Sequence, residues 1–109
     1  IEGAGGLLVP INDQETIVDL ITTEDKVIIV SAGYLGSINH TLLSAELLKA
    51  KGLNCVGIIY NHVELDGTIE VIEKMTGLKT IGHISKEQNI DKAVISKYAL
   101  QLEKSLKAL

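Results

Sequence analysis

An acidic residue followed by a glycine-rich loop opens the sequence, in the run Ile1-Glu2-Gly3-Ala4-Gly5-Gly6. Glycine lets backbone N–H groups approach an anion closely, and a neighbouring carboxylate can hold Mg²⁺ that bridges to a phosphate. The run lacks the Lys and Ser or Thr of a Walker A loop, and Leu8 replaces the third glycine of a dinucleotide fingerprint. We predict a phosphate loop formed by Gly3, Ala4, Gly5 and Gly6, with Glu2 as a metal ligand. An ordinary tight turn is the alternative.

A second candidate lies where a glycine turn meets the start of a helix, in Tyr34-Leu35-Gly36-Ser37-Ile38-Asn39-His40. The first turn of a helix presents unpaired N–H groups and a partial positive charge, so this segment could hold a carboxylate or a phosphate. An ordinary capped helix start is the alternative. Asn61, which ends an apolar run, carries an amide that matches the amine and ring nitrogen of adenine, and a plain turn residue is its alternative.

The other chemistry-bearing side chains predict no site. His40, His62 and His83 fall on three different elements without metal-ligand spacing, which favours surface or capping roles. Cys55 lies in an apolar run, so we expect a buried small hydrophobe rather than a disulfide, a metal ligand or a nucleophile. The lysines near the C-terminus are typical of a solvated helix face: Lys97, Lys104 and Lys107.

Continuous apolar runs that alternate with amphipathic segments must position these residues. The runs at 27–30, 56–59 and 80–84, with a strand end at Ile1, predict an open α/β fold with a parallel sheet covered on both faces. Helices are expected from Thr16, capped through Asp19, to 22 or 23, from 37 to 51 before Gly52, and from 68 to Gly77. A last helix is expected from 90 to 106, with this inner face: Ala93, Val94, Tyr98, Leu102 and Leu106.

Composition excludes several classes of function. With 109 residues, 46% of them hydrophobic, the chain has room for one core and is expected to be globular. A net charge of −4 without a basic run argues against nucleic acid as a partner. The sequence has no apolar stretch of membrane-spanning length and no secretory leader, so no membrane partner and a cytoplasmic location are expected. Because the chain starts on Ile1 at an expected strand end, we also expect further sequence upstream.

Taken in order, these motifs resemble the dethiobiotin synthetase family over essentially the whole chain. The resemblance rests on the acidic-glycine run, on Leu35-Gly36-Ser37-Ile38-Asn39-His40, and on the apolar run that ends at Asn61. It implies a doubly wound, mostly parallel sheet of the P-loop NTPase type, with residues 1–109 as the C-terminal part of a single domain. The Walker A half would then lie upstream. It further implies a homodimer that uses ATP, Mg²⁺ and CO2 to close the ureido ring on diaminopelargonic acid, and a segment that is inactive when isolated.

The family's functional residues carry over to matching positions. Glu2 corresponds to the magnesium-binding carboxylate, and Gly3 to Gly6 correspond to the loop beside the carbamate and the terminal phosphate. The substrate's distal carboxylate would be capped from the partner subunit by Leu35, Gly36, Ser37, Ile38 and Asn39. Nucleotide binding would fall to Asn61 and Ser85. Two residues depart from the family pattern: Tyr34 replaces a residue that is often basic, and Ser85 replaces a proline in a Gly-x-Ile-Pro stretch.

Two rival interpretations remain open at this stage. One is another P-loop ligase or an amidotransferase on the same scaffold, which would need a nucleophilic cysteine or an ammonia supply. The other is a dimerising module without catalytic activity, which would fold stably by itself. A half-fold would instead expose an apolar sheet edge and aggregate.

Overall fold

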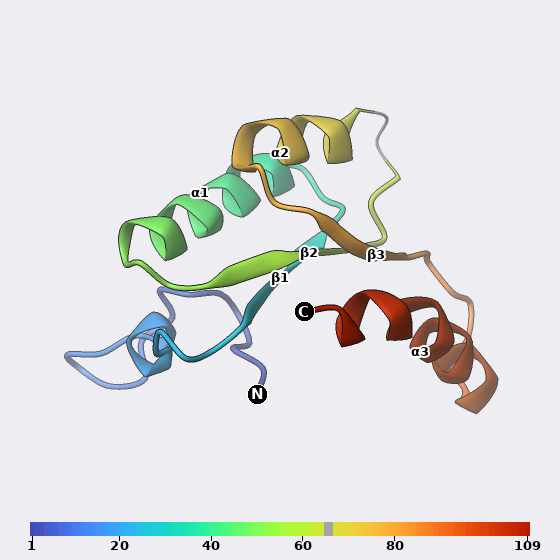
Figure 1. Cartoon of the computed structure of the whole chain (residues 1–109), viewed down its shortest axis with the longest axis horizontal. Helices are drawn as coiled ribbons and strands as arrows, with labels where there is room; N and C mark the ends of the chain where they lie inside the picture. Colours follow the sequence, from blue (N-terminus) through green and yellow to red (C-terminus); the bar gives the residue numbers. More distant parts are fainter. Residues whose placement is uncertain (65–66) are drawn as a thin grey trace.

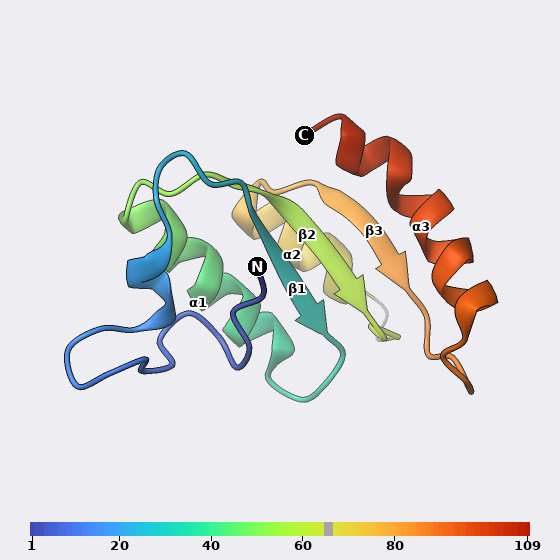
Figure 2. The same cartoon turned by 90° about the horizontal axis from the view of Figure 1, so that it is seen from below.

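The computed structural model describes residues 1–64 and 67–109 and shows a three-layer α/β fold (Figure 1). Three parallel strands lie in the order β1 (Val27–Ala32), β2 (Cys55–Asn61) and β3 (Thr80–Ile84). Helices α1 (Ser37–Ala50) and α2 (Thr68–Thr76) cover one face, and α3 (Lys92–Lys107) lies on the other side next to β3 (Figures 1 and 2). The predicted α/β class with a parallel sheet is therefore confirmed.

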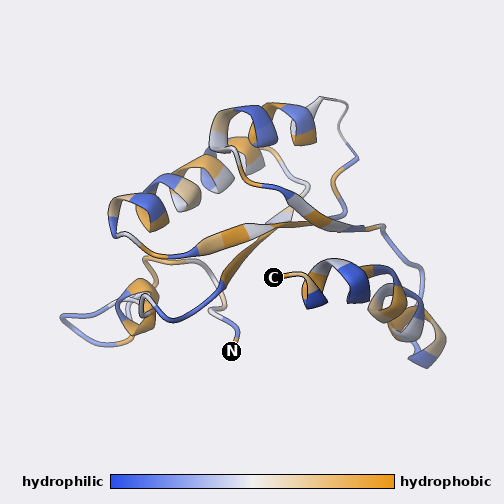
Figure 3. Ribbon diagram, in the orientation of Figure 1, coloured by the Kyte–Doolittle hydropathy of each residue, from blue (hydrophilic) through white to orange (hydrophobic). Residues whose placement is uncertain are grey.

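The strands follow the predicted apolar runs and extend beyond two of them. Figure 3 shows hydrophobic residues concentrated in β1 and β2, whereas hydrophobic and hydrophilic residues alternate along the helices. β1 continues past the predicted run to Ala32 and β2 to Asn61, while β3 has the predicted bounds. Parallel pairing places Ala32 opposite Asn61 and Asn61 opposite Ile84, so all three strands end at one edge of the sheet.

The main core lies between the sheet and the pair α1 and α2. It is built from four buried residues, Ile58, Tyr60, Val63 and Ile72, with partly buried apolar side chains packed around them. A buried hydrogen bond of 2.8 Å between the Ser31 and Thr41 hydroxyls joins β1 to α1. Because alternate strand residues point to opposite faces, Val30 points away from this core, and 62% of its surface is exposed.

The helix ends agree with the predicted stop signals. Gly52 and Gly77 follow α1 and α2 in the left-handed conformation, with φ of +68° and +70°. Glycine adopts this conformation without the steric cost that a Cβ would bring.

Two expected features near the N-terminus differ in the structure. The helix predicted from Thr16 is one 3₁₀ turn, η1 (Ile17–Leu20), because the chain is already extended at Ile21. The Thr16 N–H and hydroxyl both donate to Asp19 Oδ2 at 2.8 Å, so the Thr16–Asp19 cap is confirmed. Ile1 is fully exposed and lies outside the sheet, whose strands all come from residues 27–84, so the expected strand end does not form here.

Helix α3 begins two residues later than predicted. Asp91 caps it by accepting a hydrogen bond of 2.9 Å from the Val94 N–H, and its extended backbone excludes Ile90 from the helix. Tyr98 and Leu102 are buried as predicted, but the predicted inner residues Ala93 and Leu106 are exposed. The helix covers mainly β3, so the inner face is narrower than its periodicity suggests.

Candidate functional site at the carboxyl edge of the sheet

Backbone hydrogen bonds join the loops that leave the three strands. The Gly33 N–H donates to the Asn61 carbonyl at 3.1 Å, and the His62 N–H donates to the Ile84 carbonyl at 2.8 Å. The structure thus brings together the turn before α1, the end of β2 and the start of the β3–α3 loop. Ligands of open parallel sheets bind at this edge, outside the carboxyl ends of the strands.

The chain after β2 turns sharply beside the end of β1. His62 is a non-glycine residue with a positive φ, +57°, a conformation that few non-glycine residues adopt. Gly33 lies so close to this turn that a Cβ on it would sit 2.1 Å from the His62 carbonyl oxygen. Only glycine therefore allows the two strand ends to approach in this way.

Asn61 is fixed in place by its neighbours on both sides. Its carbonyl accepts from Gly33, and it lies opposite Ile84 in the β2–β3 register. Since the adjacent Tyr60 side chain lies in the core against α2, the half-buried Asn61 side chain points to the other face of the sheet. This is the face on which α3 lies.

The predicted carboxylate-binding segment forms the start of α1. Gly36 is the N-cap residue with φ +95°, Ser37 is buried, and the Ser37 N–H donates to the Tyr34 carbonyl at 3.0 Å. Leu35 is 99% exposed at the tip of the turn. The Tyr34 hydroxyl and His40 Nδ1 lie 2.7 Å apart, so these two side chains bridge the helix start.

Ser85 begins a loop that α3 holds in place. The Ser85 N–H donates to the Tyr98 hydroxyl at 3.0 Å, and that hydroxyl donates to Glu87 Oε1 at 2.6 Å. Lys97 Nζ also donates to Glu87 Oε1, at 2.7 Å. The hydrogen bonds from Lys97, then from Tyr98, lower the pKa of Glu87, and the pairing raises the pKa of Lys97.

Sequence reasoning missed this arrangement. Lys97 was expected on a solvated helix face and Tyr98 only as part of the inner face, and Glu87 was not singled out. No spacing rule finds the contact, because Glu87 and Tyr98 are separated by a loop and the first turn of a helix.

The predicted phosphate loop is held by contacts within the N-terminal segment. Gly5 and Gly6 have φ of +90° and +114°, which only glycine adopts readily. The Val9 N–H donates to the Gly6 carbonyl, and a Cβ on Gly3 would meet the Ile17 side chain at 2.7 Å. The backbone hydrogen bonds of this loop and the atoms nearest its glycines belong to residues 1–18, and among residues 1–64 and 67–109 no backbone hydrogen bond runs from the loop to Asn61 or Ser85.

The side chains that could bind a metal ion are scattered over residues 1–64 and 67–109. These residues contain no cluster of three or more His, Cys, Asp or Glu side chains that could hold a metal ion. Glu2 is exposed and remains a candidate for one ligand. A single carboxylate fits Mg²⁺, which commonly takes one or two carboxylates and completes its shell with phosphate oxygens and water.

The remaining candidates behave mostly as expected. His40 pairs with Tyr34 and His62 is exposed, but His83 is partly buried on β3, with a buried Nε2 that has no hydrogen-bond partner among the described residues. Cys55 is a half-buried free thiol, and burial raises its pKa. Within residues 1–64 and 67–109, no helix has the length and apolar character needed to cross a membrane.

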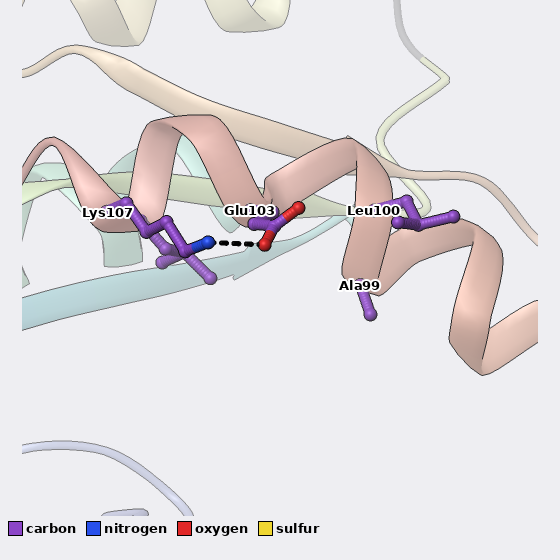
Figure 4. A pocket seen from close by; sticks show the side chains of 5 residues that line it. Ala99, Leu100, Glu103 and Lys107 are labelled. Atoms are coloured by element: carbon purple, nitrogen blue, oxygen red, sulfur yellow. Dashed lines mark hydrogen bonds and ion pairs between the residues drawn. The ribbon is translucent and has the colours of Figure 1, made fainter.

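An open hollow on α3 lies outside this candidate site. It is lined by Ala99, Leu100, Glu103, Leu106 and Lys107, and the Glu103–Lys107 ion pair crosses it (Figure 4). None of the predicted site residues lines it.

Comparison with known proteins first identifies the class. The family model described as "AAA domain" matches residues 1–94, and the chain belongs to this family. This membership agrees with the parallel sheet, the helices on both faces and the P-loop NTPase class expected from the sequence.

Individual relatives then give the particular resemblance. The chain is 50% identical over 106 residues to the ATP-dependent dethiobiotin synthetase BioD of Christiangramia forsetii, a match that covers 97% of this chain and 51% of the relative. It is 48% identical over 103 residues to that of Cytophaga hutchinsonii (94% and 50%) and 36% identical over 99 residues to that of Methanocaldococcus jannaschii (84% and 46%). The chain spans about half the length of these relatives. The resemblance to dethiobiotin synthetases is confirmed.

Proposed function

We propose that this chain is the C-terminal part of the single domain of an ATP-dependent dethiobiotin synthetase. The enzyme would carboxylate one amine of diaminopelargonic acid with CO2, phosphorylate the carbamate with ATP, and close the ureido ring by attack of the second amine. Its products would be dethiobiotin, ADP and phosphate. The observation that carries the proposal is 50% identity to such an enzyme over 97% of this chain.

Glu2 and the glycine loop would serve the phosphoryl transfer. Mg²⁺ would supply charge neutralisation at the phosphates, and the Glu2 carboxylate would contribute one of its oxygen ligands. The positive φ angles of Gly5 and Gly6 support a role for the loop beside the carbamate and the terminal phosphate, since this backbone lets N–H groups approach an anion. The Walker A loop would come from upstream sequence.

The start of α1 would bind the distal carboxylate of a substrate held by the partner subunit. Residues Leu35 to Asn39 form the turn and first helical residues, where unpaired N–H groups favour an anion. The exposure of Leu35 and Leu43, 99% and 60%, supports a subunit contact along this helix. A homodimer is therefore part of the proposal, as is a cytoplasmic location.

Asn61 and Ser85 would bind the adenine end of ATP. Their strands end side by side, and the hydrogen bond from His62 to Ile84 links the chain just after Asn61 to the residue just before Ser85. The Asn61 amide can donate to a ring nitrogen and accept from the exocyclic amine of adenine. Ser85 supplies a different loop backbone from the proline of the family pattern.

The test uses the full-length gene product with ATP, Mg²⁺ and bicarbonate, with diaminopelargonic acid added last while phosphate release is followed. We expect release that depends on the diamine and falls about 100-fold or more in Glu2→Ala. Glu24→Ala, which removes an exposed carboxylate from the turn before β1, is the matched control and should retain activity. If the folded protein binds ATP but releases no phosphate with the diamine, another ligase on the same scaffold is the better interpretation. If the gene product folds without binding nucleotide, the non-catalytic module is favoured.

A further inference from the structure

We propose that Tyr98 is a positioning residue for the nucleotide: its hydroxyl holds the loop that begins at Ser85 in the conformation that receives the base. This inference rests on the proposed nucleotide-binding role of Ser85. Tyr98 would not touch the reacting groups. It would act through the Ser85 backbone and the Glu87 side chain.

The Tyr98 hydroxyl makes two of its hydrogen bonds with loop residues, and a third, longer one of 3.5 Å comes from Lys97 Nζ. It accepts from the Ser85 N–H at 3.0 Å and donates its single proton to Glu87 Oε1 at 2.6 Å. Lys97 Nζ lies 4.6 Å from the centre of the Tyr98 ring and donates to the same Glu87 oxygen at 2.7 Å. The loop between β3 and α3 is therefore fixed at two points, one on its backbone and one on a carboxylate.

The ring that carries this hydroxyl is held firmly. Tyr98 is 8% exposed, and the next turn of α3 places Leu102 so close to β3 that a Cβ on Gly82 would lie 2.0 Å from Leu102 Cδ2. Gln101 Nε2 adds a hydrogen bond of 3.2 Å to the His83 carbonyl. Because α3 is docked on the strand from which the loop departs, the hydroxyl has a fixed position relative to the strand end.

The contact between Tyr98 and Ser85 lies one residue from the end of β3, at the candidate site. Ser85 follows Ile84, whose carbonyl accepts from the His62 N–H at the end of β2. The loop has no regular secondary structure before α3, so side-chain contacts must order it. A loop ordered in advance costs less to immobilise when a ligand binds, which favours affinity. The chemical step at the phosphates would not change.

The experiment measures Tyr98→Phe in the full-length gene product, which keeps the ring and removes only the hydroxyl. We expect the Kd and the KM for ATP to rise about tenfold, as the loss of two ordinary hydrogen bonds predicts. The kcat at saturating ATP and the KM for diaminopelargonic acid should change less than about twofold. Leu48→Ala, which truncates a fully buried side chain near the C-terminal end of α1 and away from α3, is the control for a merely structural role. It should lower the melting temperature but leave the KM for ATP within about twofold.

A second variant isolates the backbone contact. Proline has no N–H, so Ser85→Pro removes the donor to Tyr98 while it restricts φ. If the hydrogen bond from Ser85 to Tyr98 is what favours ATP binding, its loss counts only once. The double variant Ser85→Pro, Tyr98→Phe should then have a Kd for ATP within about twofold of that of the weaker-binding single variant. If the increase in Kd of the double variant equals the product of the increases in the two single variants, the proposal is contradicted.

The results separate this inference from the proposed function. A wild-type protein that binds ATP without ring closure overturns the synthetase proposal, but the Kd of Tyr98→Phe still tests Tyr98. An unchanged Kd for ATP in Tyr98→Phe, or an equal loss of ATP affinity in Leu48→Ala, overturns the positioning role. A folded wild-type protein that binds no ATP overturns both.

Discussion

Of all glycine-to-alanine substitutions in the described residues, Gly33→Ala should destabilise the protein and its candidate site the most. The new Cβ would lie 2.1 Å from the His62 carbonyl oxygen and 2.9 Å from both the His62 carbonyl carbon and Val63 Cα. All three atoms are backbone, so no side-chain rotation relieves the collision. Gly33 does not have a positive φ, which means that the steric clash alone disfavours alanine.

The size of the effect follows from the movement that is required. Real Cβ atoms do not approach within 3.0 Å of such atoms, so the two strand ends must separate by about 0.9 Å. This separation strains the hydrogen bond from the Gly33 N–H to the Asn61 carbonyl. Overpacking of this kind costs about 2–3 kcal/mol in the free energy of unfolding. For a gene product as long as the matched relatives, about 200 residues, that corresponds to a decrease of about 5–10 °C in melting temperature.

Two other glycines provide matched controls. At Gly82 the Cβ would meet Leu102 Cδ2, the end of a flexible side chain, so Gly82→Ala should cost about 1 kcal/mol less than Gly33→Ala. At Gly52 the space is open and only the φ of +68° opposes alanine, at a cost of about 1 kcal/mol. Urea unfolding of the full-length variants, with ATP titration of each, gives both stability and affinity. If Gly33→Ala is within about 0.5 kcal/mol of wild type, the close approach of β1 and β2 described here is wrong.

Three further predictions concern stability, thiol chemistry and the isolated segment. Hydrogen bonds from the backbone and side chain of Thr16, then from Lys51, lower the pKa of Asp19 from 3.8 to about 2. The stability that this pairing contributes is present above pH 3.8 and is lost as the pH falls through 2. The difference in free energy of unfolding between wild type and Asp19→Asn should therefore shrink over this pH range. A difference that stays constant would refute the assignment. Burial raises the pKa of Cys55, so iodoacetamide should modify it more slowly in the native protein than in urea, and equal rates would contradict its burial. Residues 1–109 expressed alone should sediment as aggregates, because β1 is an edge strand with Val30 62% exposed, whereas a sharp, reversible melting transition would argue for an autonomous module.

Most of the architecture could be predicted from local patterns. The apolar runs placed all three strands of the sheet, and Gly52 and Gly77 correctly marked the ends of α1 and α2. These features depend on periodicity and on the special conformation of glycine, both of which are properties of short segments. The helix expected from Thr16 was too long, because its cap was recognised but nothing local showed that one turn would suffice.

The candidate site, too, was predictable in part from the sequence and in part decided only by the tertiary structure. The sequence by itself determined which residue types could bind anions, metal and adenine, and the motif order pointed to the family. Parallel pairing, together with the strand ends, decided that the α1 turn, Asn61 and Ser85 share one edge of the sheet. The contact of Tyr98 with Ser85 and Glu87 and the approach of Gly33 to His62 arise only when distant segments pack together. Such contacts depend on how a helix docks and how two strands align, which no local spacing encodes.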